Sequence, residues 1–171
     1  MLSKTNILTI ILAGAIICCG QAATAQNISI GGGVGYGNKS NNLNFYVNGN
    51  YAIPQSPIRI GTVLGYSLRE KNSTRRVDRI RADLNTYLMA VDKEVISLYG
   101  LVGLNVSRYR TKYKTGRDAP YTDINVYAGA NAGAGLELDA GVGRYFAEGK
   151  YIFGHDAIAG FVVRTGLRVG I

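Results

Sequence analysis

Apolar and polar residues alternate along most of the chain after residue 26. A period of two places successive side chains on opposite faces of a β-strand. The alternation recurs in eight segments, most of them about ten residues long: 27–37, 43–53, 58–68, 79–90, 96–106, 123–138, 144–153 and 161–171. No helix-length apolar run follows residue 26, so the pattern predicts an all-β protein.

Segment 123–138 indicates what surrounds these strands. Every second residue from Ala128 to Ala134 is alanine, and the residues between are Gly129, Asn131 and Gly133. A soluble strand with no large side chain on either face buries too little apolar surface to be stable. In a membrane, lipid covers the alanines, and the glycines leave room for larger side chains inside a closed barrel.

The connections between the segments differ at the two ends. Segments 54–57, 92–94 and 139–143 are short turns, whereas 69–79 and 108–123 are polar and are expected to be long loops. Short turns at one end and longer loops at the other are typical of outer-membrane barrels. The fourth outer connection, 154–157, is short and fits this pattern less well.

Aromatic residues on the apolar faces are expected to form two belts. Those near the long loops are Tyr36, Tyr66, Phe153 and Phe161, and those near the short turns are Tyr51 and Tyr145. Belts at both membrane interfaces are a feature of lipid-embedded barrels. The general preference of tyrosine for strands would explain most of these positions one by one.

These patterns predict an eight-stranded antiparallel up-and-down transmembrane β-barrel. The competing interpretation is a soluble lipocalin-like, lipid-binding barrel with its apolar face inward. The two differ in whether the protein fractionates with membranes.

The first 25 residues are excluded from this domain. Lys4 precedes an apolar run over 7–19, and Ala23 and Ala25 precede a cleavage point before Gln26, which is the layout of a secretory signal peptide. We therefore expect a cleaved signal peptide over 1–25 and a barrel domain over 26–171. Cleavage would remove both cysteines, and a single histidine remains, so no Cys/His zinc site is expected.

Charged residues on the polar faces are expected to form a network inside the barrel. They are Arg59, Arg81, Asp83, Glu137, Arg144, Glu148, Lys150, Arg164 and Arg168. Glu148 should lie within reach of Arg164 and Arg168 on the next strand, and Glu137 should approach Arg144. An eight-stranded barrel has little open bore, so we expect a lumen filled by side chains rather than a narrow pore for ions or small solutes.

The two predicted long loops carry most of the basic excess of the chain. Their basic residues are Arg69, Lys71, Arg75, Arg76, Arg108, Arg110, Lys112, Lys114 and Arg117. Facing outward, such residues would meet lipopolysaccharide phosphates or another surface ligand. The simpler interpretation is a solvated rim suited to anionic headgroups. A signal peptide argues against a nucleic-acid partner.

No enzyme is expected. The sole histidine, His155, is followed by Asp156 and Ala157, so no serine stands beside it as a hydrolase would need. The glycine-rich stretches are not followed by helices and are not phosphate loops. No cofactor is expected.

Two stretches resemble a known family. The hairpin "GAGLELDAGVGRYFAEGKYIFG" (133–154), with Glu148 at an inward acidic position, is similar to the penultimate hairpin of the small eight-stranded outer-membrane barrels, which include the OmpA membrane domain, OmpX and opacity-type proteins. The last strand resembles the signal read by the barrel-insertion machinery, although it ends in Ile171 rather than Phe or Trp. The resemblance implies a monomer in the bacterial outer membrane, with a structural or adhesive role.

Overall fold

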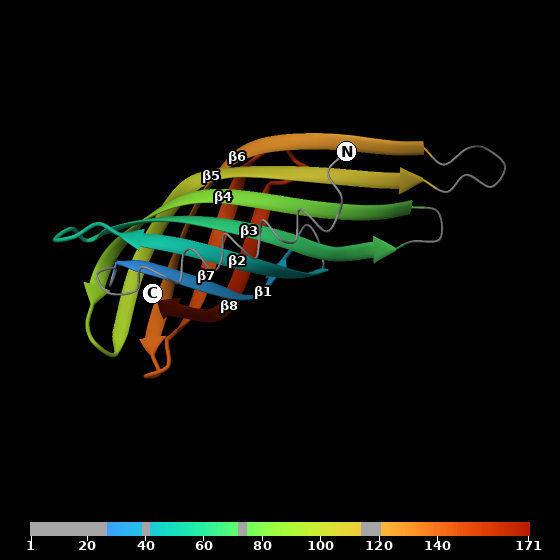
Figure 1. Cartoon of the computed structure of the whole chain (residues 1–171). Coiled ribbons are helices and arrows are strands. Elements are labelled where there is room, and N and C mark those ends of the chain that lie inside the picture. The colour runs from blue at the N-terminus through green and yellow to red at the C-terminus, as the bar shows by residue number, and fades with distance from the viewer. Residues whose placement is uncertain (1–26, 39–41, 72–74, 114–120) are drawn as a thin grey trace, which may run out of the picture.

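The computed structural model describes residues 27–38, 42–71, 75–113 and 121–171. They form eight strands that close into one barrel in sequence order, each antiparallel to its neighbours, and β8 returns to pair with β1 (Figure 1). The strands are β1 Ile28–Gly37, β2 Asn42–Ala52, β3 Ile58–Lys71, β4 Arg75–Asp92, β5 Ile96–Tyr113, β6 Tyr121–Asp139, β7 Arg144–Gly154 and β8 Gly160–Gly170. The predicted eight-stranded antiparallel barrel is confirmed. The predicted signal peptide lies outside the described residues.

The barrel is apolar on the outside and polar on the inside. Val102 and Leu104 in the middle of β5 are 60 % and 64 % exposed, while the intervening positions on the same strand face the interior, as with the buried Asn105. The same alternation runs through β1, β7 and β8. So much contiguous exposed apolar surface is costly in water and matches the acyl chains of a bilayer.

The strands differ greatly in length, which corrects the predicted loops. Strands β4, β5 and β6 have 18, 18 and 19 residues, whereas β1, β2, β7 and β8 have 10 or 11. The sequence predicts loops over 69–79 and 108–123, but β3 and β4 pair through Lys71↔Arg76, and β5 and β6 pair through Tyr113↔Tyr121. Beyond the lipid the outward face need not be apolar, so polar residues continue the ladder.

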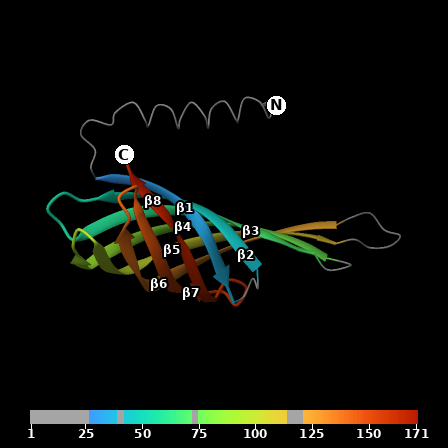
Figure 2. The same ribbon diagram turned by 90° about the horizontal axis from the view of Figure 1, so that it is seen from below.

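The result is a barrel with one tall wall. In both views β3 to β6 run well past the ends of the other strands (Figures 1 and 2). We call this part, residues 75–81, 107–113 and 121–127 of β4, β5 and β6, the sheet extension. It projects from the end opposite the short turns, which span 53–57, 93–95 and 140–143.

The first and last strands meet along a seam built from glycine. Gly33 lies opposite Gly166 in the β1–β8 register. A Cβ atom added at Gly33 would lie 2.1 Å from the Thr165 carbonyl oxygen, and one at Gly166 would lie 2.1 Å from the Gly32 carbonyl oxygen. The two backbones therefore approach too closely for any side chain at these positions.

Among the described residues no helix is long and apolar enough to span a membrane.

Candidate functional site

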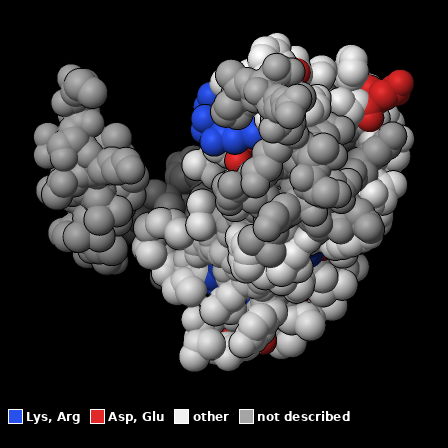
Figure 3. Space-filling view, turned by 90° about the vertical axis from the view of Figure 1, so that its right-hand side faces the viewer, with Lys and Arg blue, Asp and Glu red and all other residues white. Residues whose placement is uncertain are grey.

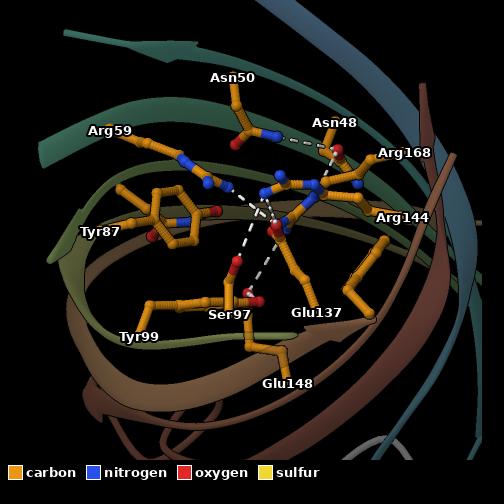
Figure 4. Close-up of polar contacts among 12 residues, drawn as sticks. Asn48, Asn50, Arg59, Tyr87, Ser97, Tyr99, Glu137, Arg144, Glu148 and Arg168 are labelled. Atoms are coloured by element: carbon orange, nitrogen blue, oxygen red, sulfur yellow. Dashed lines mark hydrogen bonds and ion pairs between the residues drawn. The ribbon is translucent and has the colours of Figure 1, made fainter. Parts of the chain in front are cut away.

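The lumen contains three layers of side chains, and the layer nearest the short turns is centred on Glu137. Its buried carboxylate accepts hydrogen bonds from Arg59, at 2.8 Å, and from Arg168, and the Arg144 guanidinium lies 3.7 Å away (Figure 4). These four residues come from β3, β6, β7 and β8, so the cluster ties together walls that are far apart in the sequence. Arginine clusters of this kind neutralise a carboxylate that would otherwise be costly to bury.

Asp92 extends this layer to the mouth of the barrel at the short-turn end. Its carboxylate accepts a 2.6 Å hydrogen bond from the Ser97 hydroxyl and lies 3.4 Å from Arg59 and 3.5 Å from Arg144. The Ser97 hydroxyl and the two guanidiniums stabilise the ionised Asp92 carboxylate at this mouth. A cavity of about 500 Å³ opens here beside Asn50, Arg59 and Asp92.

The middle layer is built on Glu148 and Asp83. Glu148 pairs with Arg164, lies 3.8 Å from Arg168, and accepts a 3.3 Å hydrogen bond from the Tyr99 hydroxyl. Asp83 pairs with Lys150 and also accepts from the Asn105 amide, with Arg164 at 3.9 Å. All of these side chains are buried.

Aromatic and aliphatic side chains fill the space between the charges. The Arg168 guanidinium lies 4.1 Å from the centre of the Phe146 ring, and Tyr87 and Tyr99 pack edge to face at 5.4 Å. The charge pattern does not single out the inward apolar residues, which are Val63, Leu101, Phe146, Ile152 and Val162. Their positions in the period-two alternation could have identified them, because each lies between two outward-facing neighbours on its own strand.

The outer end of the lumen is covered by the β7–β8 connection. Ile158 of this connection is buried against Tyr109, Ile152 and Val162. The Tyr109 hydroxyl donates a 2.7 Å hydrogen bond to the Ala157 carbonyl, and the Arg79 guanidinium lies 4.2 Å from the Tyr109 ring. This apolar cap is the third layer.

The predicted lumen residues do not all occupy equivalent places. Eight of the nine meet in the two charged layers, namely Arg59, Asp83, Glu137, Arg144, Glu148, Lys150, Arg164 and Arg168. Arg144 stands at the mouth, where its side chain is 35 % exposed. Arg81 faces the lumen separately, beside a small cavity near Lys150.

The structure places the predicted belt residues on the outward face. Tyr36, Tyr66, Phe153, Phe161, Tyr51 and Tyr145 are all exposed. Phe45, which pairs with Tyr66, and Tyr151, whose ring lies 4.9 Å from that of Phe153, join them. Their role as membrane-interface belts stays a prediction.

The predicted basic patch is described only in part. Arg108 and Arg110 are exposed on the outward face of β5, and Lys112 is half-buried. Arg69, Lys71, Arg75 and Arg76 belong to the ends of β3 and β4, but their side chains lie outside the described set, as do Lys114 and Arg117 entirely. Seen from the side of the sheet extension, basic atoms gather on one side of the barrel, and the largest acidic group lies at the opposite edge (Figure 3).

His155 helps to form the β7–β8 turn. Its carbonyl accepts hydrogen bonds from the backbone of Ile158 and Ala159, its Nδ1 accepts one from Ala157, and its ring stacks on Tyr127 at 4.5 Å. The described residues contain no cluster of His, Cys, Asp and Glu suited to a metal ion.

Comparison with solved structures places the fold among small outer-membrane barrels. Ail, the attachment invasion locus protein of Yersinia pestis, is 16 % identical with a TM-score of 0.51, and the match covers 84 % of this chain and 95 % of Ail. A major outer membrane protein from Thermus thermophilus is 10 % identical with a TM-score of 0.62, covering 85 % and 98 %. Neisserial surface protein A is 10 % identical with a TM-score of 0.50, covering 85 % and 95 %.

The protein therefore has the fold of the small eight-stranded outer-membrane β-barrels. No protein-family model and no curated protein sequence matches the chain. The predicted likeness to OmpA and OmpX in particular stays a prediction.

Proposed function

We propose that the protein is an integral outer-membrane barrel with a filled lumen that binds phosphate groups of lipopolysaccharide through the outward face of its sheet extension. The proposal includes no catalytic step and no cofactor. The mature chain would begin near Gln26 after removal of the signal peptide. The barrel-insertion machinery would recognise its last strand, β8, and the inserted protein would act as a monomer.

One observation carries this proposal, namely the position of Arg108 and Arg110. They follow Leu104 and Val106 on the same outward face of β5, so the lipid-facing stripe changes there from aliphatic to guanidinium side chains. Arg108 is also in register with Ile80, which pairs with Tyr66 on the next strand. An exposed arginine directly after an aromatic and aliphatic band stands where lipid headgroups begin. Guanidinium binds phosphate through two parallel hydrogen bonds.

The comparison with Ail supports a polyanionic ligand of this kind. Ail has been solved in complex with the heparin analogue sucrose octasulfate, a densely anionic sugar, and that structure matches this chain at 16 % identity with a TM-score of 0.50. Sulfate and phosphate oxygens present the same acceptor geometry to arginine. Adhesion to anionic sugars would therefore use the same contacts between arginine and anionic oxygens.

The filled lumen supports a surface role rather than transport. Two layers of ion pairs and an apolar cap occupy the interior between Asp92 at one mouth and Ile158 at the other. Eight strands leave an interior just wide enough for such side chains. At the end covered by the cap, the chemistry available to a partner therefore lies on the outside of the barrel.

The test is binding of lipopolysaccharide by the Arg108→Ser/Arg110→Ser double variant. The protein is refolded into phospholipid nanodiscs, and its affinity for lipopolysaccharide micelles is compared with its affinity for a dephosphorylated preparation. Loss of the two phosphate contacts should weaken binding at least about tenfold, which corresponds to about 1.4 kcal/mol. Dephosphorylation should weaken binding to the unaltered protein by a similar factor.

Two controls make the result specific. Lys93→Ser removes an exposed basic residue in the turn at the opposite end and should leave the affinity unchanged. Arg108→Lys/Arg110→Lys keeps the charge but loses the bidentate geometry, so it should bind with intermediate affinity. Equal binding by the serine variant and the unaltered protein would refute the assignment to this face.

A further inference from the structure

The sheet extension has one backbone edge that no described strand covers. Strand β7 pairs with β6 only between Gly129, which lies opposite Gly154, and Asp139. The preceding residues 121–127 of β6 pair with β5 on one side and with no described strand on the other (Figure 1). We call residues 121–127 the β6 edge. Its backbone N–H and C=O groups on that side are oriented to pair with a further strand.

The opposite edge of the extension has features that hinder such pairing. Strand β2 pairs with β3 no further than Ser67, and the register between β3 and β4 shifts between Ser67 and Glu70. Residues Arg69, Glu70 and Lys71 at the end of β3 are all charged. Charged side chains and bulges are the usual protection of an edge strand. The β6 edge contains no lysine, arginine or proline, and its register with β5 continues without a shift.

The sequence of the β6 edge, YTDINVY, is nearly the same when read in either direction from Ile124. Two copies of this segment that pair in antiparallel fashion about Ile124 would therefore place matching side chains opposite each other. Aromatic pairs stabilise antiparallel ladders, β-branched residues favour strands, and an asparagine amide can donate to an aspartate carboxylate. The pairs would be Ile124 with Ile124, Asp123 with Asn125, Thr122 with Val126, and Tyr121 with Tyr127 of the second copy.

The outward side chains of the β6 edge lie at the level where the lipid-facing stripe ends. Val126 is in register with Arg108, and Ile124 is in register with Arg110, one step further from the barrel. Ile124 and Val126 are 48 % and 61 % exposed. Since the arginines stand where headgroups begin, acyl chains do not cover Ile124. An exposed aliphatic side chain in this position, beside an open backbone edge, indicates a protein contact.

The inward side chains of the β6 edge are held in place by their own chain. The Tyr121 ring stacks on that of Tyr113, with 6.3 Å between the ring centres. The Tyr127 ring packs edge to face on that of Tyr109, at 5.6 Å. Side chains that are already ordered lose less conformational entropy when a partner binds.

Pairing in this register fixes the orientation of the two barrels. A residue that faces itself lies on a two-fold axis, and in an antiparallel pair this axis is perpendicular to the sheet. The rotation reverses the strands, so the two barrels point away from each other. Because the extension projects from the end opposite the short turns, the second copy cannot lie in the same membrane. This geometry fits a copy in a facing membrane.

We propose that the β6 edge is a homophilic contact site, which joins the protein to a second copy in a facing outer membrane. The two edges form one antiparallel ladder about Ile124, and the two sheet extensions continue as one sheet across the contact. A single contact of this length is weak, and many copies on each membrane provide its strength. The lipopolysaccharide surface proposed above is complete in one copy, so this pairing is an additional property.

The first experiment uses the unaltered protein refolded into phosphatidylcholine vesicles, which contain no lipopolysaccharide and carry no net charge. Two vesicle populations with different dyes are mixed, and clusters that contain both dyes are counted by fluorescence cross-correlation. Such clusters should form when both populations carry the protein, and should be at least about tenfold rarer when only one population does. Equal clustering in the two cases would show that the protein binds lipid of the facing vesicle, and would overturn the homophilic contact.

Charged residues at position 124 test the two-fold register, because this position faces itself. Ile124→Lys on both populations places like charges opposite each other and should reduce clustering at least about tenfold, and Ile124→Glu should do the same. Vesicles with Ile124→Lys mixed with vesicles with Ile124→Glu should cluster again, since opposite charges then face each other. Val142→Lys changes an exposed valine in a short turn at the other end and should leave clustering unchanged. Arg108→Ser/Arg110→Ser should also leave it unchanged, which separates this contact from lipopolysaccharide binding.

Cysteine substitutions measure the register directly. Once Cys18 and Cys19 are replaced by serine, an introduced cysteine is the only thiol of the chain. Ile124→Cys should form a disulfide between two copies, because residues directly opposite in an antiparallel pair have Cα atoms within disulfide range. Thr122→Cys and Val126→Cys should each fail to cross-link alone and should cross-link when mixed.

Two results would overturn the proposal. One is an absence of clustering by the unaltered protein when both populations carry it. The other is a mixture of Ile124→Lys and Ile124→Glu vesicles that clusters no more than either variant alone. Folding of each variant is checked by its compact form on unheated denaturing gels. If a charged variant does not fold, the cysteine series decides, and failure of Ile124→Cys to cross-link would count against the contact.

Discussion

Lys150 of β7 and Asp83 of β4 form a buried ion pair between two walls of the barrel that are not neighbours. Both side chains are almost completely excluded from solvent, and Asn105 supplies a further hydrogen bond to the carboxylate. The pair links the two halves of the chain through the lumen, where no backbone hydrogen bond can reach.

Removing one member of this pair should be strongly destabilising. Lys150→Met leaves the buried Asp83 carboxylate with only the more distant Arg164, at 3.9 Å, as a counter-charge, and breaking a buried pair in this way costs about 3–5 kcal/mol. The free energy of unfolding can be measured by urea titration in detergent, followed by circular dichroism. The double variant Lys150→Met/Asp83→Asn should recover much of the loss, because no unpaired charge remains. Equal stability of the two variants would show that the pair is not coupled.

The filled lumen predicts very low conductance in planar bilayers. The unaltered protein should show no stable openings, because the rings of Tyr99 and Phe146 and the side chain of Arg168 close the interior around the two charged layers. Tyr99→Ala/Phe146→Ala removes the two rings and should raise the ion leak. Stable openings of porin size in the unaltered protein would contradict the filled lumen.

Strand β6 allows the inside and outside of the barrel to be compared on one strand. A Cβ atom at Gly133 would lie 2.2 Å from the Gly149 carbonyl oxygen, so Gly133→Ala should force the backbone to move and should cost about 1–3 kcal/mol. Ala130 faces outward and is exposed, so Ala130→Leu should be neutral or stabilising in lipid. Urea titration in phospholipid vesicles measures both. A destabilising Ala130→Leu would indicate a packed protein environment outside the barrel.

Charge on the outward face should be penalised according to depth. Val102 lies midway along the lipid-facing stripe of β5 and is 60 % exposed, so Val102→Arg should cost about 2–4 kcal/mol in a bilayer. Val95 lies in the turn before β5, so Val95→Arg should cost about 0–1 kcal/mol. The measurement is again vesicle-based urea titration. Similar costs at both positions would argue that Val102 does not lie in hydrocarbon.

The alternation of residues is sufficient to predict the barrel and the face on which most strand residues lie. It is interrupted where the register shifts, between Ser67 and Glu70 in β3 and between Met89 and Val91 in β4, and the pattern therefore misses Asp92 at the mouth of the lumen. It works best where one face has to be apolar, as in the alanine run of β6, because lipid leaves no alternative. It fails beyond the membrane, where the polar character of 108–123 predicts a loop. There the outward face carries Arg108 and Arg110, and the strand is recognisable only from its pairing with β6.

The lumen can be predicted as a set of residues but not as a set of partners. Period two places Phe146 and Ile152 inside together with Glu148 and Lys150, yet a search for inward charges passes over the two apolar residues. Contacts such as Lys150 with Asp83 depend on strand tilt and stagger across the barrel, which no local pattern encodes. The cap formed by Ile158 depends on the shape of a short turn, which the sequence pattern does not encode either.

The glycine seam between β1 and β8 has a consequence for how the cylinder assembles. These two strands are the most distant in the chain, so joining them carries the largest loop-closure entropy of any strand pair. Positions such as Gly33 and Gly166 offer little side-chain contact to offset that cost, and the ladder there relies on its backbone hydrogen bonds. Closure is therefore expected to be the final cooperative event of folding, and thermal fraying should begin along the same line.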